Sequence, residues 1–203
     1  MFRPVRIAKV NPILSRTHKL VIASLSALIF SVVFAACGSS EPPASIERVI
    51  DHERIFMIDD LRISSMKAAK HYDVTDLPNA VDAWYGFIQT DKGPMDIEAR
   101  FYASHADAVS FGTALAEEVS GDDAIIDEDL TTWPEGYKDR QRMRSGGTAD
   151  LSAWSGQRGP NYADFVIYGN VVLLCQGDEP LDSIRVCHEL ITALNDRFTA
   201  IGG

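Results

Sequence analysis

Residues 163–176 read ADFVIYGNVVLLCQ, two apolar runs separated by Gly169-Asn170. A Gly-Asn pair between β-prone runs predicts a tight hairpin, because both residue types adopt the left-handed backbone that such turns need. Asp178 and Pro180 follow and are typical of a helix start. The apolar residues of the expected helix share one face: Ile184, Cys187, Ile191, Leu194 and Phe198. The C-terminal part of the chain is therefore predicted to be a hairpin followed by a helix.

A second hairpin and helix are predicted earlier in the chain. Residues 81–90 have the aromatic-rich composition of a strand. After a turn at residues 92–94, residues 96–102 alternate between apolar and charged side chains, as a strand does. A capping-box pattern at Ser104 then opens a predicted helix.

We expect these elements to form a single α+β domain over residues 46–203. The simplest packing has two layers, in which one antiparallel sheet is built from two β-hairpins, each followed by a helix (ββα–ββα), with the helices on one face. An additional N-terminal helix is expected to begin at Ser45. Residues 122–160 form a long connection, which contains either a short strand around Gln141 or a functional loop.

The first 36 residues have the features of an export signal. Residues 1–19 contain five cations and no acid, and residues 20–36 contain no charged residue. This apolar run is shorter than the roughly 20 residues that a membrane-spanning helix needs. A basic start, a short apolar run and small residues before a break are typical of a cleaved signal peptide. The alternative is an uncleaved anchor, and in both cases the domain lies outside the cytosol because the basic end stays inside.

The stretch Phe34-Ala35-Ala36-Cys37 closes the apolar run. It resembles the lipobox of bacterial lipoproteins, in which small residues precede the cysteine that receives the lipid. The resemblance implies that residues 1–36 are a signal peptide, that Cys37 becomes the acylated N-terminus, and that residues 37–45 are a tether. It also implies a membrane partner, either the cell membrane or the outer membrane, with the domain on the extracytoplasmic side. Two or three acyl chains hold a protein on a bilayer where one chain is marginal.

Charge limits the class of partner. Removal of residues 1–36 leaves 167 residues (203 − 36), the size of one ordinary domain. The signal carries 5 of the 19 Lys and Arg residues and none of the 29 Asp and Glu residues, so the remaining formal charge is −15 (14 − 29). A negative field of this size repels nucleic acid and gives no general attraction to anionic lipid headgroups. We therefore expect no nucleic-acid partner.

Cys175 and Cys187 remain as an even pair in a compartment that permits disulfides. Cys175 lies at the end of a predicted strand, and Cys187 lies on the apolar face of the helix that follows. A helix packed against its own strand brings two such α-carbons within the roughly 4.4–6.8 Å that a bridge requires. We predict a structural disulfide, and the alternative is two buried thiols that act as small apolar side chains.

Arg140, Arg142 and Arg144 alternate, so on a strand their guanidinium groups share one face. Such a row suits a carboxylate or a phosphate, and it is the predicted anion- or partner-binding site, with Trp133 nearby. The alternative is that these arginines pair with neighbouring acids. Loop aromatics such as Trp133 and Trp154 either contact a partner or close over the sheet as a small separate core. Two further cations of this connection are Lys138 and Arg158.

The sequence predicts no metal site, cofactor or catalytic residue. The histidines of the mature chain lack the spacing of metal ligands, and the common catalytic motifs are absent. One acidic run either is solvated or holds calcium, although it lacks the EF-hand arrangement. Its members are Asp122, Asp123, Asp127, Glu128 and Asp129.

The predicted function is non-catalytic binding of a small ligand or a protein partner at the membrane surface, through the 122–160 connection. One alternative is a hydrolase that acts on envelope material, with acid–base groups among His105, Asp164 and the acidic run. A deep cleft that gathers two carboxylates or a His–Asp pair would favour the hydrolase. Another alternative is a structural lipoprotein that only stabilises or spaces another component.

Overall fold

The computed structural model describes residues 46–144 and 157–202. The predicted signal peptide, Cys37, the tether and Trp154 lie outside these residues. Within the described ranges, no helix is both long and apolar enough to cross a membrane.

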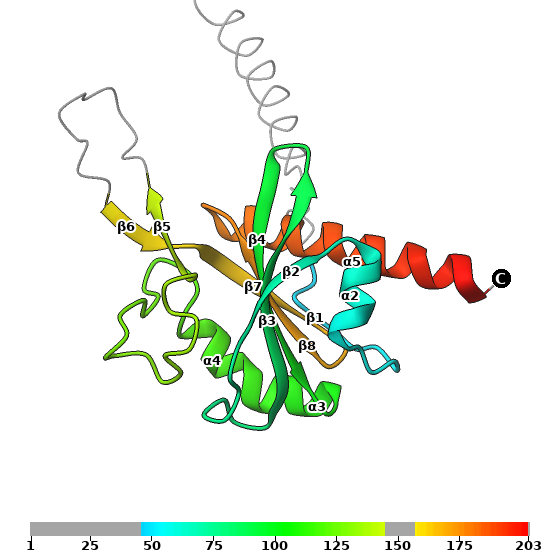
Figure 1. The fold of residues 1–203 in the computed structure, drawn as a ribbon, viewed down its shortest axis with the longest axis horizontal. Coiled ribbons are helices and arrows are strands. Elements are labelled where there is room, and N and C mark those ends of the chain that lie inside the picture. Colours follow the sequence, from blue (N-terminus) through cyan, green and yellow to red (C-terminus); the bar gives the residue numbers. More distant parts are fainter. Residues whose placement is uncertain (1–45, 145–156, 203) are drawn as a thin grey trace, which may run out of the picture. The chain divides into compact units, whose positions relative to one another are not determined.

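The fold is built on a six-stranded sheet with the strand order β1-β7-β8-β4-β3-β2 (Figure 1). Its strands are β1 (Val49–Ile50), β2 (Lys67–His71), β3 (Ala80–Thr90), β4 (Gly93–Tyr102), β7 (Tyr162–Tyr168) and β8 (Val171–Gln176). β1 runs parallel to β7, whereas the other neighbouring strands of the sheet are antiparallel. A separate ribbon pairs β5 (Gln141–Arg144) with β6 (Gln157–Pro160).

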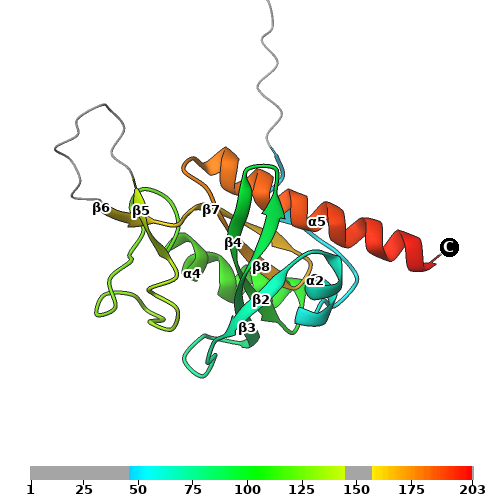
Figure 2. The same cartoon turned by 45° about the horizontal axis from the view of Figure 1, so that its top comes forward.

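Helices cover both faces of the sheet (Figure 2). The helical elements are α2 (Ile58–Ser64), α3 (His105–Asp107), the π-helical turn η2 (Ala108–Gly112), α4 (Thr113–Glu117) and α5 (Pro180–Gly202). α2 and α5 pack on one face, where Ile97 and Ala99 of β4 join their core. The segment from α3 to α4 packs on the other face, where Tyr102 of the same strand joins a second core. The sheet is therefore the middle layer of three.

The predicted two-layer ββα–ββα packing is wrong. Both hairpins and the helices after them are present, but the sheet is mixed and the two helical segments lie on opposite faces. The physical reason is visible in β7, whose residues are all buried, and in β8, which is buried from Val171 to Cys175. Strands that are apolar on both faces need a covering layer on each.

The predicted N-terminal helix is also wrong. The chain is extended at Val49–Ile50, and the first well-formed helix begins only at Ile58. The amide of Ile167 donates to the carbonyl of Arg48 at 2.7 Å, and the amide of Gly169 donates to that of Ile50 at 2.9 Å. These bonds pair backbone amides on the outer side of β7, which would otherwise be an open sheet edge.

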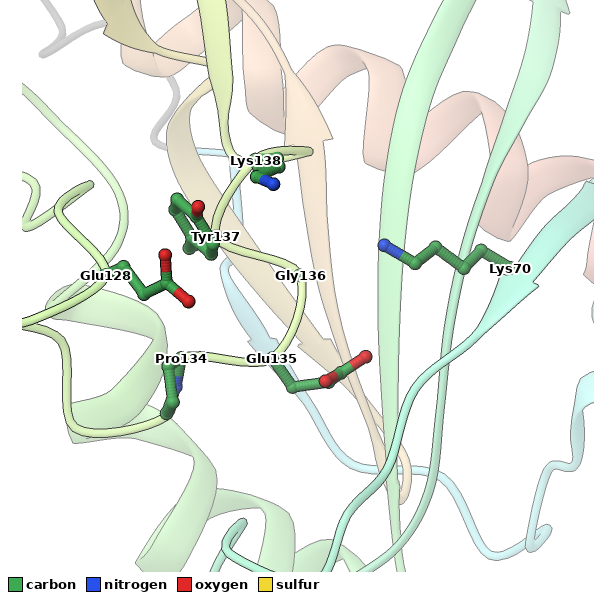
Figure 3. Close-up of a pocket in the computed structure, with 7 residues that line it drawn as sticks. All are labelled: Lys70, Glu128, Pro134, Glu135, Gly136, Tyr137 and Lys138. Carbon is green, nitrogen blue, oxygen red and sulfur yellow. The ribbon is translucent and has the colours of Figure 1, made fainter.

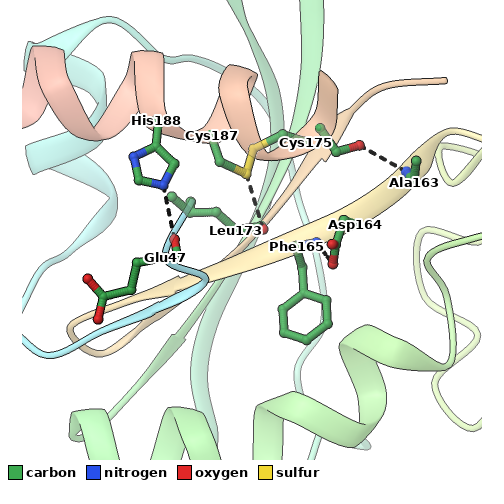
Figure 4. Close-up of a disulfide and its surroundings, with 9 residues drawn as sticks. Glu47, Ala163, Asp164, Phe165, Leu173, Cys175, Cys187 and His188 are labelled. Atoms are coloured by element: carbon green, nitrogen blue, oxygen red, sulfur yellow. Dashed lines mark hydrogen bonds between the residues drawn. A yellow bond between two sulfur atoms is a disulfide. The ribbon is translucent and has the colours of Figure 1, made fainter. Parts of the chain in front are cut away.

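The predicted disulfide is confirmed (Figure 4). Cys175 of β8 and Cys187 of α5 are joined with a Cα–Cα distance of 5.5 Å. Two further contacts hold α5 on the sheet. The hydroxyl of Ser183 accepts from the amide of Ala163 at 2.9 Å, and Nε2 of His188 lies 3.1 Å from the carbonyl oxygen of Glu47.

Candidate functional site

A buried group of charges lies on the face of the sheet that α4 covers. Glu98 and Arg100 of β4 are 0% and 1% exposed, and Arg140, which directly precedes β5, is 1% exposed. The carboxylate of Glu98 accepts from Nε of Arg100 at 2.7 Å and from Nε of Arg140 at 2.8 Å. Nη2 of Arg140 adds a second bond to the same carboxylate at 3.1 Å. One carboxylate is therefore shared by two guanidinium groups.

Trp133 packs against this group. The Cζ atoms of Arg140 and Arg100 lie 4.6 Å and 5.1 Å from the centroid of its indole ring, within the range of cation–π attraction. Its carbonyl accepts from Nη1 of Arg140 at 2.9 Å, and its indole N–H donates to the carbonyl of Asp73 at 3.2 Å. With Tyr72, Trp133 belongs to a small separate core. It closes over the sheet and is not exposed to a partner.

The two arginines determine the protonation state of Glu98. Burial favours the neutral acid, but the charges of Arg140 and Arg100 outweigh burial and hold the pKa of Glu98 below its usual value. The carboxylate is therefore ionised at neutral pH. The bond from Glu98 to Arg140 joins β4 to the segment that precedes β5, across 42 positions of sequence.

The turn over residues 134–140 fits closely against β2. Gly136 has a φ of +76°, and a Cβ at this position would lie 2.5 Å from the ring of Tyr72. A larger residue is therefore both strained and obstructed here. The hydroxyl of Tyr72 donates to Asp139 at 2.7 Å, and Nζ of Lys70 lies 3.0 Å from the same carboxylate oxygen.

Two more contacts fix the ends of this region. Glu118, just after α4, accepts at 2.6 Å from both the amide and the hydroxyl of Thr132. Burial raises the pKa of Glu118, but the hydrogen bonds from Thr132 outweigh burial and keep it below its usual value. Asn161, between β6 and β7, donates to Asp96 of β4 at 2.9 Å and to the carbonyl of Asp139 at 3.1 Å. We call residues 126–143 the docked segment, because these contacts hold it on the sheet.

The surface of the docked segment carries three adjoining hollows. The first has a volume of about 260 Å³ (Figure 3). Its lining residues are Lys70, Glu128, Pro134, Glu135, Gly136, Tyr137 and Lys138. In Figure 3, Lys70 reaches from its strand toward the turn, and Glu128 and Tyr137 lie on the far side of that turn.

The other two hollows differ in charge. The acidic hollow has a volume of about 420 Å³ and is lined by Ile126, Asp127, Glu128, Asp129, Tyr137, Gln141 and Arg158. The basic hollow has a volume of about 290 Å³ and is lined by Lys138, Gln141, Arg142, Met143 and Arg158. Gln141 and Arg158 line both, so the two hollows share a wall. The side-chain amide of Gln141 donates to the carbonyl of Ile126 and ties β5 to the docked segment.

The structure separates the arginines of the predicted anion site. Arg140 is buried against Glu98 and is not available to an external anion. Arg142 is partly exposed and is paired with Asp178, while only the backbone of Arg144 is described. The predicted single row is therefore corrected, because its first member lies before β5 and faces the core. Lys138 and Arg158, which the sequence places in the same connection, line the basic hollow with Arg142.

His105 and Asp164, named for the alternative hydrolase, do not meet. Nδ1 of His105 lies 2.7 Å from the carbonyl oxygen of Gly169 at the β7–β8 turn, whereas Asp164, near the start of β7, is paired with Arg48. These positions are at opposite ends of β7. In the part of the chain that the structure describes, no group of three or more His, Cys, Asp or Glu side chains could hold a metal ion.

Sequence reasoning placed Glu98 and Arg100 on the charged face of an alternating strand and gave them no role. A usable signal was present, because the face of β4 that carries them also carries Tyr102, and the strands beside it are apolar on both faces. Charges on a strand inside such a sheet are covered, and covered charges need partners of opposite sign. Tyr137 of the hollows carried no distinguishing pattern, and Gln141 was named only for the short strand expected around it, which is β5.

Comparison with known proteins identifies a matching family model. Neither the curated proteins nor the solved structures include a match to this chain. A family model described as "Family of unknown function (DUF6810)" matches residues 57–196. This range contains the buried charges, the disulfide and the docked segment. The chain belongs to the DUF6810 family.

Proposed function

We propose that this protein is an exported lipoprotein, anchored to a membrane through Cys37, whose domain binds a small ligand or a protein partner at the three hollows of the docked segment. The anchor rests on the resemblance of Phe34-Ala35-Ala36-Cys37 to a lipobox. The binding function rests on the hollows and on how firmly their walls are held.

The observation that carries the binding proposal is the attachment of a charged, hollowed surface to a buried ion group. A buried salt bridge adds little net stability relative to apolar residues of the same volume, but breaking one is costly. Such a group therefore favours one position of the segment over all others. A binding surface benefits from this fixed geometry, because a preorganised site loses less entropy when a ligand binds.

The direction of β1 supports a site near the membrane. β1 runs parallel to β7, so Ile46, which precedes β1, lies toward the end of the sheet where β7 begins. The β5–β6 ribbon joins β7 at this same end. The eight residues between Cys37 and Ile46 reach at most about 26–29 Å. An anchor at Cys37 would keep Ile46 within that distance of the bilayer, at the end of the sheet where the ribbon lies.

Native mass spectrometry of the full-length protein, extracted from membranes in mild detergent, tests this proposal. We expect a mass that begins at Cys37, carries acyl chains and lacks the two hydrogens of one disulfide. A further bound species that is lost from the Arg142→Gln/Arg158→Gln variant would support ligand binding at the hollows. A chain that begins at residue 1 or 2 without acyl groups would contradict the anchor, and a bound species unaffected by the double substitution would contradict the site.

A further inference from the structure

We propose that the ligand of the hollows is zwitterionic, of the size of a short peptide, with its anionic group in the basic hollow and its cationic group in the acidic hollow. This inference rests on the proposed binding function and deepens it by naming the class of ligand.

The basic hollow is suited to a carboxylate or a phosphate. Three cations line it, Lys138, Arg142 and Arg158, and none of its described lining residues is an acid. Arg142 donates to Asp178, which lies outside the lining. The Nε atom of Arg142 is buried and has no hydrogen-bond partner among the described residues. A ligand oxygen would satisfy this donor, and guanidinium groups bind planar anions through two parallel bonds.

The other cations of the basic hollow are not neutralised by described residues. Arg158 makes only a long contact of 3.4 Å to the side-chain oxygen of Gln141, and it forms no ion pair with the described part of the chain. Nζ of Lys138 lies 5.4 Å from the ring of Tyr137. The chain after residue 36 has a formal charge of −15 (14 − 29), so acids outnumber cations about two to one. Cations without an acid partner are unusual in such a chain.

The acidic hollow indicates that the other charged group of the ligand is cationic. Its lining includes the three carboxylates Asp127, Glu128 and Asp129. The side chain of Asp127 accepts from the amide of Asp129 at 2.9 Å, so the two acids are held together by their own turn. An extended anion that starts in the basic hollow would meet these carboxylates across the shared wall. A ligand that also carries an ammonium group would instead be attracted on both sides.

The dimensions agree with a small ligand. Hollows of about 290 Å³ and 420 Å³ are at the lower end of the range for small-molecule sites, roughly 300–1,000 Å³. Both are lined by Arg158 and Gln141, so one molecule can occupy them together. A nucleic acid or an anionic lipid headgroup would be attracted by the basic hollow alone.

Calorimetric titration of the full-length protein in mild detergent tests the proposal with four probes. The probes are trialanine, N-acetyl-trialanine, trialanine amide and inorganic phosphate. Trialanine carries both charges, its acetylated form lacks the ammonium group, and its amide lacks the carboxylate. We expect trialanine to bind at least about tenfold more tightly than the other three, because each blocked terminus removes one charged interaction.

The matched variants are Arg158→Gln and Arg197→Gln, and each removes one positive charge. Arg158 lies in the wall that the two hollows share, whereas Arg197 is an exposed residue of α5 that lines neither hollow. We expect Arg158→Gln to weaken trialanine binding about tenfold and Arg197→Gln to leave it unchanged.

Equal binding of all three peptides, or equal effects of both variants, overturns the proposal. Preferential binding of phosphate, lost in Arg158→Gln, overturns the zwitterion but leaves a binding function at the hollows. No binding by any probe overturns the inference, and the bound species sought by native mass spectrometry then decides the proposed function separately.

Discussion

Nε of Arg140 lies 2.8 Å from the carboxylate of Glu98, although the two residues are 42 positions apart and both are buried. This bond joins the middle of the sheet to the docked segment. Because the same guanidinium also donates to the carbonyl of Trp133 at 2.9 Å, it fixes a second point of that segment. We therefore expect the geometry of the hollows to depend on a residue that does not line them.

Replacing Arg140 should destabilise the fold far more than replacing Arg142. Arg140→Met leaves the carboxylate of Glu98 buried with one fewer partner, and removing one member of a buried ion pair costs about 3–5 kcal/mol. Arg142 is paired with Asp178, whose side chain is 71% exposed, and pairs of this kind contribute about 0–1 kcal/mol. Urea denaturation of the two variants measures both values. Similar losses in Arg140→Met and Arg142→Met would show that the buried bond is not a principal contact.

Acid should weaken the fold through Glu98. Because its pKa is lower in the folded chain than in the unfolded chain, Glu98 contributes stability above its usual pKa, and this contribution disappears as the pH falls through the folded value. The affected range lies below about pH 4.5. We expect Glu98→Gln to be less stable than the wild type at pH 7 and to lose less stability between pH 5 and pH 3, in about the range where carboxylates titrate.

Asp164 provides a control of opposite sign. Burial raises its pKa, so the folded chain binds a proton more readily than the unfolded chain and gains stability as the pH falls. Asp164→Asn removes that gain and should make the acid-induced loss steeper. Urea denaturation across the pH series measures both slopes, and an unchanged slope in Glu98→Gln would contradict the account.

The disulfide should contribute about 3 kcal/mol to the free energy of unfolding. It closes a loop with a sequence separation of 12, and loops of this size restrict the unfolded chain by about that amount. The double variant Cys175→Ala/Cys187→Ala should show the loss in denaturant, and the wild type in reductant should approach it. Reductant should not affect the double variant. A double variant as stable as the oxidised wild type would mean that the bridge contributes nothing.

Gly136 and Gly93 form a matched pair for testing the turn over β2. Both have positive φ values, +76° and +109°, but a Cβ at Gly93 meets nothing within 4 Å, whereas one at Gly136 meets Tyr72. Gly93→Ala should cost only the backbone strain of about 1–2 kcal/mol. Gly136→Ala should cost about 1–3 kcal/mol more, because the ring must move. Equal losses in thermal and urea denaturation would show that the turn does not fit against Tyr72 as described.

The sequence predicts local elements well where the signal is local. The Gly169-Asn170 turn, the helix cap at Ser104 and the spacing of Cys175 and Cys187 each depend on residues close together in the chain, and the structure contains all three features. The layer arrangement depends on which faces are covered. That information was present in the unbroken apolar runs of β7 and β8, but the turn signals alone led to a two-layer fold.

The candidate site was harder to predict because its geometry is non-local. Arg140 finds its partner 42 positions away, and the alternation of the arginines indicated a strand that begins one residue too early. The sequence named all three cations that line the basic hollow, Lys138, Arg142 and Arg158. It gave no indication that Asp127 and Glu128 would adjoin them, since that depends on how the docked segment folds back on β5.

Hydrogen exchange of the docked segment in the wild type and in Arg140→Met tests most directly whether the buried bond holds the hollowed surface in place. The amides of Thr131 and Asp139 donate within this segment, to Asp127 at 3.1 Å and Gly136 at 2.9 Å. We predict slow exchange at these amides in the wild type and at least about tenfold faster exchange in Arg140→Met, with β7 and β8 still protected. Equal exchange rates in the two proteins would contradict the claim that Glu98 and Arg140 fix the surface on which the hollows lie.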